Sequence, residues 1–147
     1  MQYADCMPFI QYSKVKKFSG RIRTVKCFED NSKVKEVLAS PGERDVLVVD
    51  AGASLRRAIL GDLIANSAAN NDWAGVLING AVRDSGVIGE MDSIGIAALG
   101  TNPRKSDRRG HGLVDEPVCF CGLSFVAGDF VYVDHDGVIV SKTRLHV

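Results

Sequence analysis

An arginine and an aspartate stand side by side just after an apolar run, and together they could do chemistry. The run covers residues 75–79 and has the β-branched content of a buried strand. Gly80 breaks it, and Arg83 and Asp84 follow before a second glycine turn. A buried strand that delivers a cation and an anion to such a turn can hold both groups on a rigid element. Taken alone, these residues slightly favour a simpler interpretation, a surface ion pair in a polar turn.

A second candidate lies upstream, in the segment Gly61, Asp62, Leu63 and Ile64. Asp62 is well placed to N-cap a helix that runs to about Asn70. The first turn of such a helix exposes backbone N–H groups, which suit the carboxylate of a substrate. A simple helix cap explains the aspartate equally well, so both interpretations stay open.

Two further groups carry side chains that can bind metal ions. Cys119 and Cys121 match no common zinc spacing, and cysteines in a chain of this size without an export signal are expected to be reduced. Asp134, His135 and Asp136 fall where an Asp-Gly pair predicts a hairpin turn. The sequence therefore favours free thiols and a polar turn over metal sites.

Basic residues gather in the polar loop 101–112, and lysines alternate with aromatic residues in the segment 1–20. The basic residues of the loop are Arg104, Lys105, Arg108 and Arg109. The 147 residues include 18 basic and 18 acidic ones, and a net charge of zero argues against a nucleic-acid or anionic membrane partner. No apolar run is long enough to span a membrane, and the first residues lack the pattern of a secretory signal. We expect a cytoplasmic protein that contacts neither nucleic acid nor membrane directly.

Strands and helices alternate along the chain in a way that predicts a layered α/β or α+β domain. The expected strands are residues 21–28, 46–49, 75–79, 94–99, 118–121, 130–133 and 138–140, and the expected helices lie near 32–38, 55–59 and 62–70. Residues 1–20 are expected to be irregular. The strand, glycine turn and helix at 46–59 lack the glycine patterns of dinucleotide-binding, phosphate-binding and serine-hydrolase turns.

Several segments in a fixed order resemble one known family. They are residues 25–31, 46–55, 73–75, 80–84, 99–106, 128–129 and 136–140. From Phe18 onward the chain resembles the RraA family, which comprises regulators of RNase E activity and related 4-hydroxy-4-methyl-2-oxoglutarate aldolases. The resemblance implies one RraA-like domain over residues 1–147, with the layered swivelling β/β/α type of α/β fold. It also implies a ring-shaped homotrimer with sites between subunits.

The aldolase branch of this family is similar in having an Arg-Asp pair after a strand, a Gly-Asp loop upstream and a divalent cation. Those positions are Arg83, Asp84 and residues 61–64 here. The regulator branch can lack the aspartate, and this chain keeps it, which favours catalysis. Cleavage that releases pyruvate passes through an enolate, which needs a metal or a Schiff-base lysine. No lysine lies near this stretch, which favours the metal.

The expected roles follow from that chemistry. Asp84 would bind Mg2+ or Mn2+, which need few protein ligands, and Asp62 would assist through a bound water. Arg83 would stabilise the enolate oxygen, and the amides of Leu63 and Ile64 would hold the substrate carboxylate. We expect a metal-dependent class II pyruvate aldolase that cleaves 4-hydroxy-4-methyl-2-oxoglutarate or a similar 2-oxo acid and decarboxylates oxaloacetate. The alternative is a non-catalytic regulator that binds an RNase E-type nuclease and inhibits it.

Overall fold

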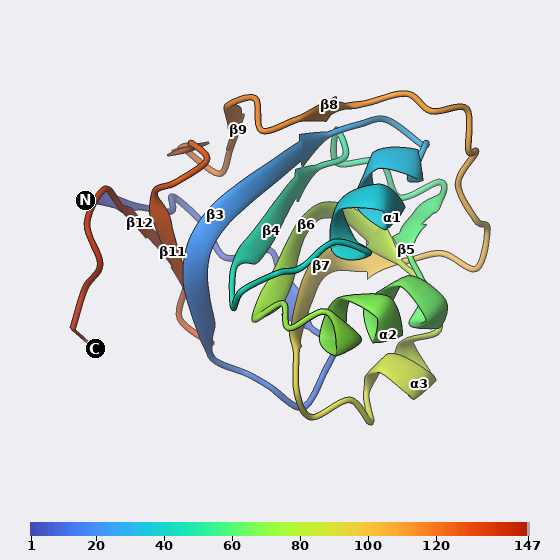
Figure 1. Ribbon diagram of the computed structural model, residues 1–147, viewed down its shortest axis with the longest axis horizontal. Coiled ribbons are helices and arrows are strands. Elements are labelled where there is room, and N and C mark those ends of the chain that lie inside the picture. Colours follow the sequence, from blue (N-terminus) through green and yellow to red (C-terminus); the bar gives the residue numbers. More distant parts are fainter. Residues whose placement is uncertain (147) are drawn as a thin grey trace.

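A ten-stranded mixed sheet runs through the computed structural model, which describes residues 1–146 (Figure 1). Its strand order is β1-β12-β11-β3-β4-β6-β7-β2, and β5 and β8 pair beside this path with β6 and β3. Strands β9 and β10 form a separate two-stranded sheet. The arrangement confirms the α/β class that the sequence predicts.

The described elements alternate from the N-terminus onward. The strands are β1 Gln2–Tyr3, β2 Ile10–Gln11, β3 Phe18–Lys26, β4 Val46–Asp50, β5 Ala58–Leu60, β6 Gly75–Val82, β7 Gly95–Thr101, β8 Leu113–Val114, β9 Val118–Phe120, β10 Leu123–Phe125, β11 Phe130–Val133 and β12 Val138–Ser141. The helices are α1 Ser32–Leu38, α2 Asp62–Asn70 and α3 Ser85–Ile88. None of these helices is long and apolar enough to cross a membrane.

Strand β3 joins the two parts of the large sheet. Its first half pairs antiparallel with β11, where Arg21 faces Phe130, and its second half pairs parallel with β4, where Ile22 faces Val46. Strands β3, β4, β6 and β7 then run parallel, so their carboxyl ends meet at one edge of the sheet. In an open parallel sheet this edge is where ligands bind.

The parallel strands are buried on both faces, as their continuous apolar runs predict. Along β4, Leu47 and Val49 pack with α1 and α2, whereas Val46 and Val48 pack against the strands from β9 to β12. Figure 1 shows α1 and α2 on one side of these strands and the β11–β12 hairpin beyond β3. Two hydrophobic cores therefore hold the parallel strands from both sides and fix their carboxyl ends.

The predicted helix at residues 55–59 is wrong, because Ala58–Leu60 forms strand β5. This segment pairs in parallel with β6, and the Ala58 N–H donates to the Arg104 oxygen at 2.7 Å on its other side. Pairing on both sides overrides the local helical spacing. Strand β6 also continues past Gly80 to Val82, with a register shift between Ile78 and Ala81 rather than an end. Strands β1, β2, β8 and β10 and helix α3 were not predicted.

Candidate active site

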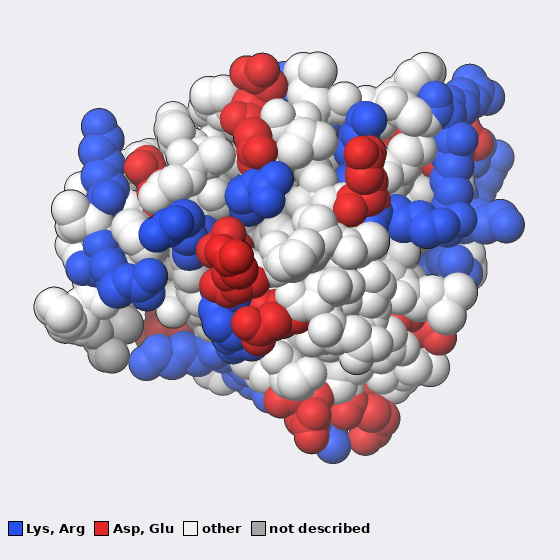
Figure 2. All heavy atoms as spheres, in the orientation of Figure 1, with Lys and Arg blue, Asp and Glu red and all other residues white. Residues whose placement is uncertain are grey.

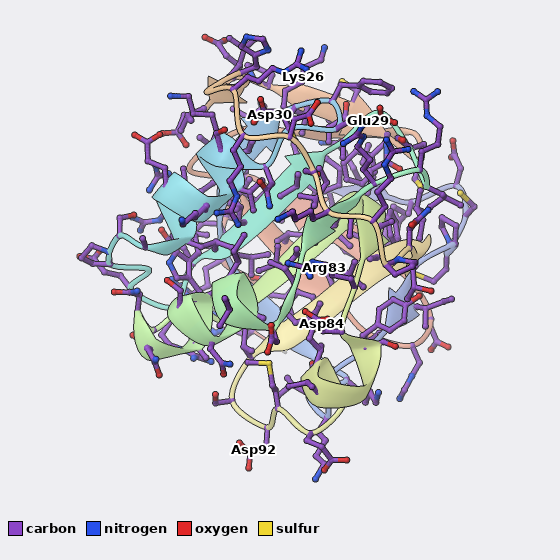
Figure 3. All side chains as sticks on the ribbon, turned by 90° about the vertical axis from the view of Figure 1, so that its right-hand side faces the viewer. Lys26, Glu29, Asp30, Arg83, Asp84 and Asp92 are labelled. Atoms are coloured by element: carbon purple, nitrogen blue, oxygen red, sulfur yellow. The ribbon has the colours of Figure 1, made fainter. Side chains whose placement is uncertain are left out.

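The end of β6 and the start of α2 bring the two candidate segments together. The Arg83 N–H donates to the Leu60 oxygen at 2.9 Å, which ties the end of β6 to the end of β5. Helix α2 begins two residues after Leu60, at Asp62. Arg83 and Asp84 consequently lie at the carboxyl ends of the parallel strands, between the first turn of α2 and the short helix α3 (Figure 3).

Asp84 has an unusual backbone conformation, with φ 58° and ψ 38° in the left-handed region. A residue other than glycine is uncommon there, and such strain tends to occur at functional sites. Asp84 precedes α3, and its carbonyl oxygen accepts the Ile88 N–H at 2.9 Å, but its side chain makes no capping bond to this helix. Instead, its Oδ2 accepts a hydrogen bond from the Asp62 N–H at 3.0 Å. The strained backbone thus directs the carboxylate to the N-terminus of α2.

The surroundings of Asp84 favour its charged form. The Asp62 N–H is the largest influence and lowers the pKa of the Asp84 carboxyl; partial burial opposes this effect, and the Asp62 carboxyl and the Arg83 guanidinium lower the pKa further. Because the Asp62 N–H binds Asp84 Oδ2, the two residues place neighbouring carboxyl groups at the start of α2. Two neighbouring carboxyl groups repel one another when both are ionised, unless a proton or cation is shared between them.

Gly61 allows this close approach. A Cβ atom built on Gly61 would lie 2.8 Å from Asp84 Oδ2 and 3.0 Å from Arg83 Nε. Any side chain at this position would displace the pair from the start of α2. Gly61 also occupies the N-cap position, so the prediction that Asp62 caps the helix is wrong. Asp62 is instead the first helical residue, where a negative charge suits the helix dipole.

The first turn of α2 has N–H groups available for a ligand. The Ala65 N–H donates to the Gly61 oxygen at 3.0 Å, the i to i−4 bond that closes this turn. The N–H groups of Leu63 and Ile64 precede that bond and have no intrahelical acceptor. The Leu63 side chain is 76% exposed, whereas Ile64 packs in the core and anchors the turn. All residues of the predicted site therefore lie together, although their roles stay predictions.

Comparison with known proteins now places this fold. A family model described as RraA-like, Aldolase/RraA, matches residues 2–140. The chain belongs to the RraA-like family. A protein of Acinetobacter baylyi, which carries the provisional name 4-hydroxy-4-methyl-2-oxoglutarate aldolase, is 52% identical and aligns over 93% of this chain and 80% of its own.

Solved RraA-like structures share the fold but carry different names. The RNA-processing inhibitor RraA from Thermus thermophilis superposes with a TM-score of 0.92 at 39% identity, covering 95% of this chain and 85% of its own. A Geobacillus kaustophilus protein named S-adenosylmethionine:2-dimethylmenaquinone methyltransferase gives 0.94 at 44% identity, covering 98% and 88%. Because three names accompany one fold, function must be argued from the site.

The residues of this RraA-like site fit a hard divalent cation with few protein ligands. Within residues 1–146, no three His, Cys, Asp or Glu side chains gather as a metal site. Asp62 and Asp84 offer two carboxylates, and one hydrogen bond leaves most of the acceptor capacity of Asp84 unused. Mg2+ and Mn2+ prefer oxygen ligands, and Mg2+ keeps several waters, so a pair of carboxylates can suffice.

The other candidate groups have structural roles in the described chain. All four cysteines are free thiols. Asp134 Oδ1 accepts the N–H groups of Asp136 and Gly137, as a hairpin turn requires. In the basic loop, Arg109 pairs with Asp107 at 3.7 Å, and its N–H donates to Asp30.

A second polar cluster lies at the same edge of the sheet and was not predicted from the sequence. Glu29 accepts hydrogen bonds from Ser54 Oγ and Arg56 Nε, both at 2.7 Å, and Arg57 donates to Asp107 at 3.1 Å. An acidic residue just after a strand, with two adjacent arginines downstream, was the available signal. Glu29 lies at the far end of the edge from Arg83 and Asp84, and Asp92 lies on the opposite side of them (Figure 3). These residues therefore do not extend the Asp84 site.

Proposed function

We propose that this protein is a divalent-cation-dependent lyase of the class II pyruvate aldolase type. Its substrate would be 4-hydroxy-4-methyl-2-oxoglutarate or a similar 4-hydroxy-2-oxo acid, and the same site would decarboxylate oxaloacetate. The observation that carries this proposal is the Asp84 carboxylate, which is held at the N-terminus of α2 by the Asp62 N–H at 3.0 Å, with Arg83 beside it. The names of relatives about 50% identical support the same reaction.

The start of α2 and Arg83 bind the substrate in this proposal. The N–H groups of Leu63 and Ile64, at the positive end of the helix dipole, receive the substrate carboxylate. The Arg83 guanidinium donates to the keto oxygen and stabilises the negative charge that develops there. Asp84 would hold the cation, with Asp62 assisting through a bound water, and the cation would supply Lewis-acid stabilisation of the same charge.

One bond-breaking step serves both substrates. In aldol cleavage the C4 hydroxyl loses its proton, the C3–C4 bond breaks, and its electron pair moves onto the keto oxygen through the new C2–C3 double bond. In decarboxylation the same carbon loses carbon dioxide. Both routes leave the enolate of pyruvate, and a proton on C3 completes the product. One group of residues that stabilises this enolate can therefore catalyse both reactions.

The site also suggests how copies of the chain would assemble. Leu55, Leu63 and Val87 surround this edge and are 47%, 76% and 54% exposed. A second copy that covers them would exclude water from the site. Our proposal includes a homotrimer, which static light scattering can test; a monomer across micromolar concentrations would contradict it.

The decisive experiment measures pyruvate release from oxaloacetate and from 4-hydroxy-4-methyl-2-oxoglutarate by the purified protein. Excess chelator should abolish both reactions, and added Mg2+ or Mn2+ should restore them. Arg83→Lys keeps the charge but loses the planar fork, so both rates should fall about 100-fold or more. Wild-type rates of pyruvate release in excess chelator, or by the Arg83→Lys variant, would contradict this mechanism.

The second candidate function is a regulator that binds an RNase E-type nuclease. Its support is the Thermus protein named as an RNA-processing inhibitor, which superposes with a TM-score of 0.92. A nuclease assay with wild-type protein and Asp84→Asn separates the two functions. Inhibition that persists in Asp84→Asn belongs to a surface outside the lyase site, and absence of inhibition by either protein rejects this candidate.

A further inference from the structure

A groove of about 420 Å³ lies on the outer face of the antiparallel part of the sheet, and a smaller polar pocket of about 240 Å³ adjoins it. Ser19, near the start of β3, lines both spaces. The Asp84 site lies instead at the carboxyl ends of the parallel strands. The two spaces are thus separate from the proposed lyase site.

The period-two pattern of the strands builds the floor of the groove. Along β11, Val131 and Val133 point into the core, so Phe130 and Tyr132 point outward. Tyr132 pairs with Ser19 on one side and with Ile139 of β12 on the other. The resulting floor is apolar and half-buried, with one phenol in it.

The chain after β12 folds back and forms a wall of the groove. The Leu145 N–H donates to the Tyr132 hydroxyl at 2.6 Å, and Leu145 lines the groove. The neighbouring Arg144 places its guanidinium carbon 4.9 Å from the centre of the Phe130 ring. This segment is therefore fixed to the floor by a hydrogen bond and by a cation–π contact.

The polar pocket concentrates positive charge at one end of the groove. Arg21 and Arg144 both contact the Phe130 ring, at 5.9 Å and 4.9 Å, and Arg44 lines the same pocket. The pocket also contains the carboxylates of Glu43 and Asp45. Figure 2 shows basic and acidic side chains interleaved on this side of the molecule.

Of the three arginines at the pocket, one has an ion-pair partner among the described residues. Arg44 pairs with Asp72 at 3.6 Å. Burial raises the pKa of Asp45, and the nearby Arg21 lowers it, so Arg21 is partly neutralised. Within residues 1–146 no ion pair includes Arg144 or Arg21, but only Arg21 has Asp45 as a nearby opposite charge. An anion at the pocket would therefore bind chiefly to Arg144, with Arg21 as its second contact.

Backbone strain occurs at the same place. Glu43 and Arg44 are consecutive residues with φ 52° and 61°, within a turn that the Asp45 N–H closes on the Gly42 oxygen at 2.9 Å. Two left-handed residues in succession are costly for residues other than glycine. Strained residues of this kind cluster at ligand clamps. The turn holds Arg44 at the mouth of the polar pocket.

We propose that the groove and the polar pocket together bind a small amphipathic monoanion, such as a medium-chain or aromatic monocarboxylate. Its carboxylate lies between Arg144 and Arg21, and its apolar body lies over Tyr132 and Ile139. The volume of the groove falls within the range of small-molecule sites. Because Glu43 and Asp45 also line the pocket, a ligand with one negative charge suits it better than a dianion.

The far end of the groove sets the orientation of the ligand. Lys17, Asp134 and Asp136 line that end. Asp134 accepts the N–H groups of the hairpin, and the exposed Asp136 carboxylate offsets the positive charge of Lys17, so this end has no excess positive charge. The ligand carboxylate consequently points to the arginine end.

The test uses fluorescence of anilinonaphthalene sulfonate, an aromatic monoanion, with octanoate, octanol and inorganic phosphate as competitors. Octanoate should displace the probe at concentrations about ten-fold or more below those of octanol, because only octanoate carries the charge. Arg144→Gln and Arg21→Gln should each weaken octanoate binding, Arg144→Gln by about ten-fold or more.

Arg56→Gln is the matched control, because Arg56 also stacks on a phenylalanine, Phe28 at 5.8 Å, but outside this groove. It should bind octanoate like wild type. Circular dichroism verifies that each variant is folded. Equal competition by octanoate and octanol, wild-type binding by folded Arg144→Gln, or phosphate displacing the probe as well as octanoate would each overturn the proposal.

Discussion

Asp30 and Asp84 both follow a parallel strand at the same edge of the sheet, but the surroundings of the two carboxylates differ. Asp30 is 3% exposed and accepts four hydrogen bonds: from the Ser32 N–H and hydroxyl and from the N–H groups of Arg109 and His111. Asp84 is partly exposed and accepts one, from the Asp62 N–H.

The difference shows how one residue type serves two purposes. A carboxylate has about four acceptor positions. Those of Asp30 are filled by the chain itself, which fastens the loop at residues 107–111 to the start of α1. Most of those of Asp84 remain for a ligand, and its strained backbone keeps them pointing at a helix N-terminus. Asp30 is therefore expected to support folding, and Asp84 catalysis.

The largest effect is expected from Asp84→Asn. This change keeps the size of the side chain but removes the charge that holds the cation. Pyruvate release should fall about 100- to 1000-fold or more, the loss typical of removing one group that stabilises an oxyanion. The melting temperature should stay near that of wild type, because the amide oxygen of Asn can still accept the Asp62 N–H. Wild-type rates in this variant would show that Asp84 is not a ligand.

Asp30→Asn should give the opposite result. Hydrogen bonds to a charged group contribute about 1.5–3 kcal/mol, so the free energy of unfolding should drop by roughly 2 kcal/mol or more. Lyase rates measured well below the melting temperature should change little. Urea denaturation of both variants, alongside the rate assay, tests the contrast. An Asp30→Asn protein that unfolds like wild type would contradict it.

The stability contributed by Asp30 should also depend on pH. Burial raises the pKa of this carboxyl, but the four hydrogen bonds outweigh burial and lower the pKa from 3.8 to about 2. A lowered pKa stabilises the fold at pH values above 3.8, and this contribution is lost as the pH falls toward 2. The gap in stability between wild type and Asp30→Asn should therefore narrow over that interval, as urea titrations at a series of pH values would show.

A smaller effect is expected from Gly61→Ala. The added Cβ would press on Asp84 Oδ2 and Arg83 Nε, which are side-chain atoms and can move aside. The fold should survive, whereas the rate should drop by roughly ten-fold, since small misplacements in a site are costly. Gly86→Ala is the matched control, because a Cβ there meets nothing within 4 Å. Equal rates for the two variants would argue against the close approach at Gly61.

The sequence predicts most of the sheet because its central strands carry long apolar runs. Val46–Asp50 and Gly75–Val82 are buried on both faces, and such runs can be recognised without knowing their neighbours. The segment 55–59 offered too few residues to distinguish a helix from a strand. Its pairing with residue 104 depends on contacts distant in the chain.

The same reasoning explains which parts of the site could be predicted. Asp62 and Asp84 each stand next to the end of an element, which marks them as candidates. Their contact joins residues 22 positions apart and was expected only from the family resemblance. The bonds of Asp30 to Arg109 and His111 span 79 and 81 positions, so no local pattern indicated them.

The smallest effect is expected at Asp115, a third carboxylate. It has a charged partner but is exposed, so it distinguishes the contribution of ion pairing from that of burial. Arg23 donates to both of its oxygens, at 2.8 and 3.0 Å, but the two side chains are 31% and 42% exposed. Exposed ion pairs contribute about 0–1 kcal/mol. Asn tolerates the left-handed backbone of Asp115 (φ 62°), so Asp115→Asn tests the charge without adding strain.

Asp115→Asn should therefore lower the free energy of unfolding by at most about 1 kcal/mol, and high salt should reduce the difference further. Lyase rates should not change, since the side chain of Asp115 is engaged by Arg23 and Asp115 is not a residue of the proposed site. Parallel urea titrations of Asp115→Asn and Asp30→Asn compare the two carboxylates directly. Equal losses of unfolding free energy in the two variants would mean that an exposed charged partner stabilises a carboxylate as much as burial among backbone N–H donors does. The contrast between Asp30 and Asp84 would then need another explanation than burial.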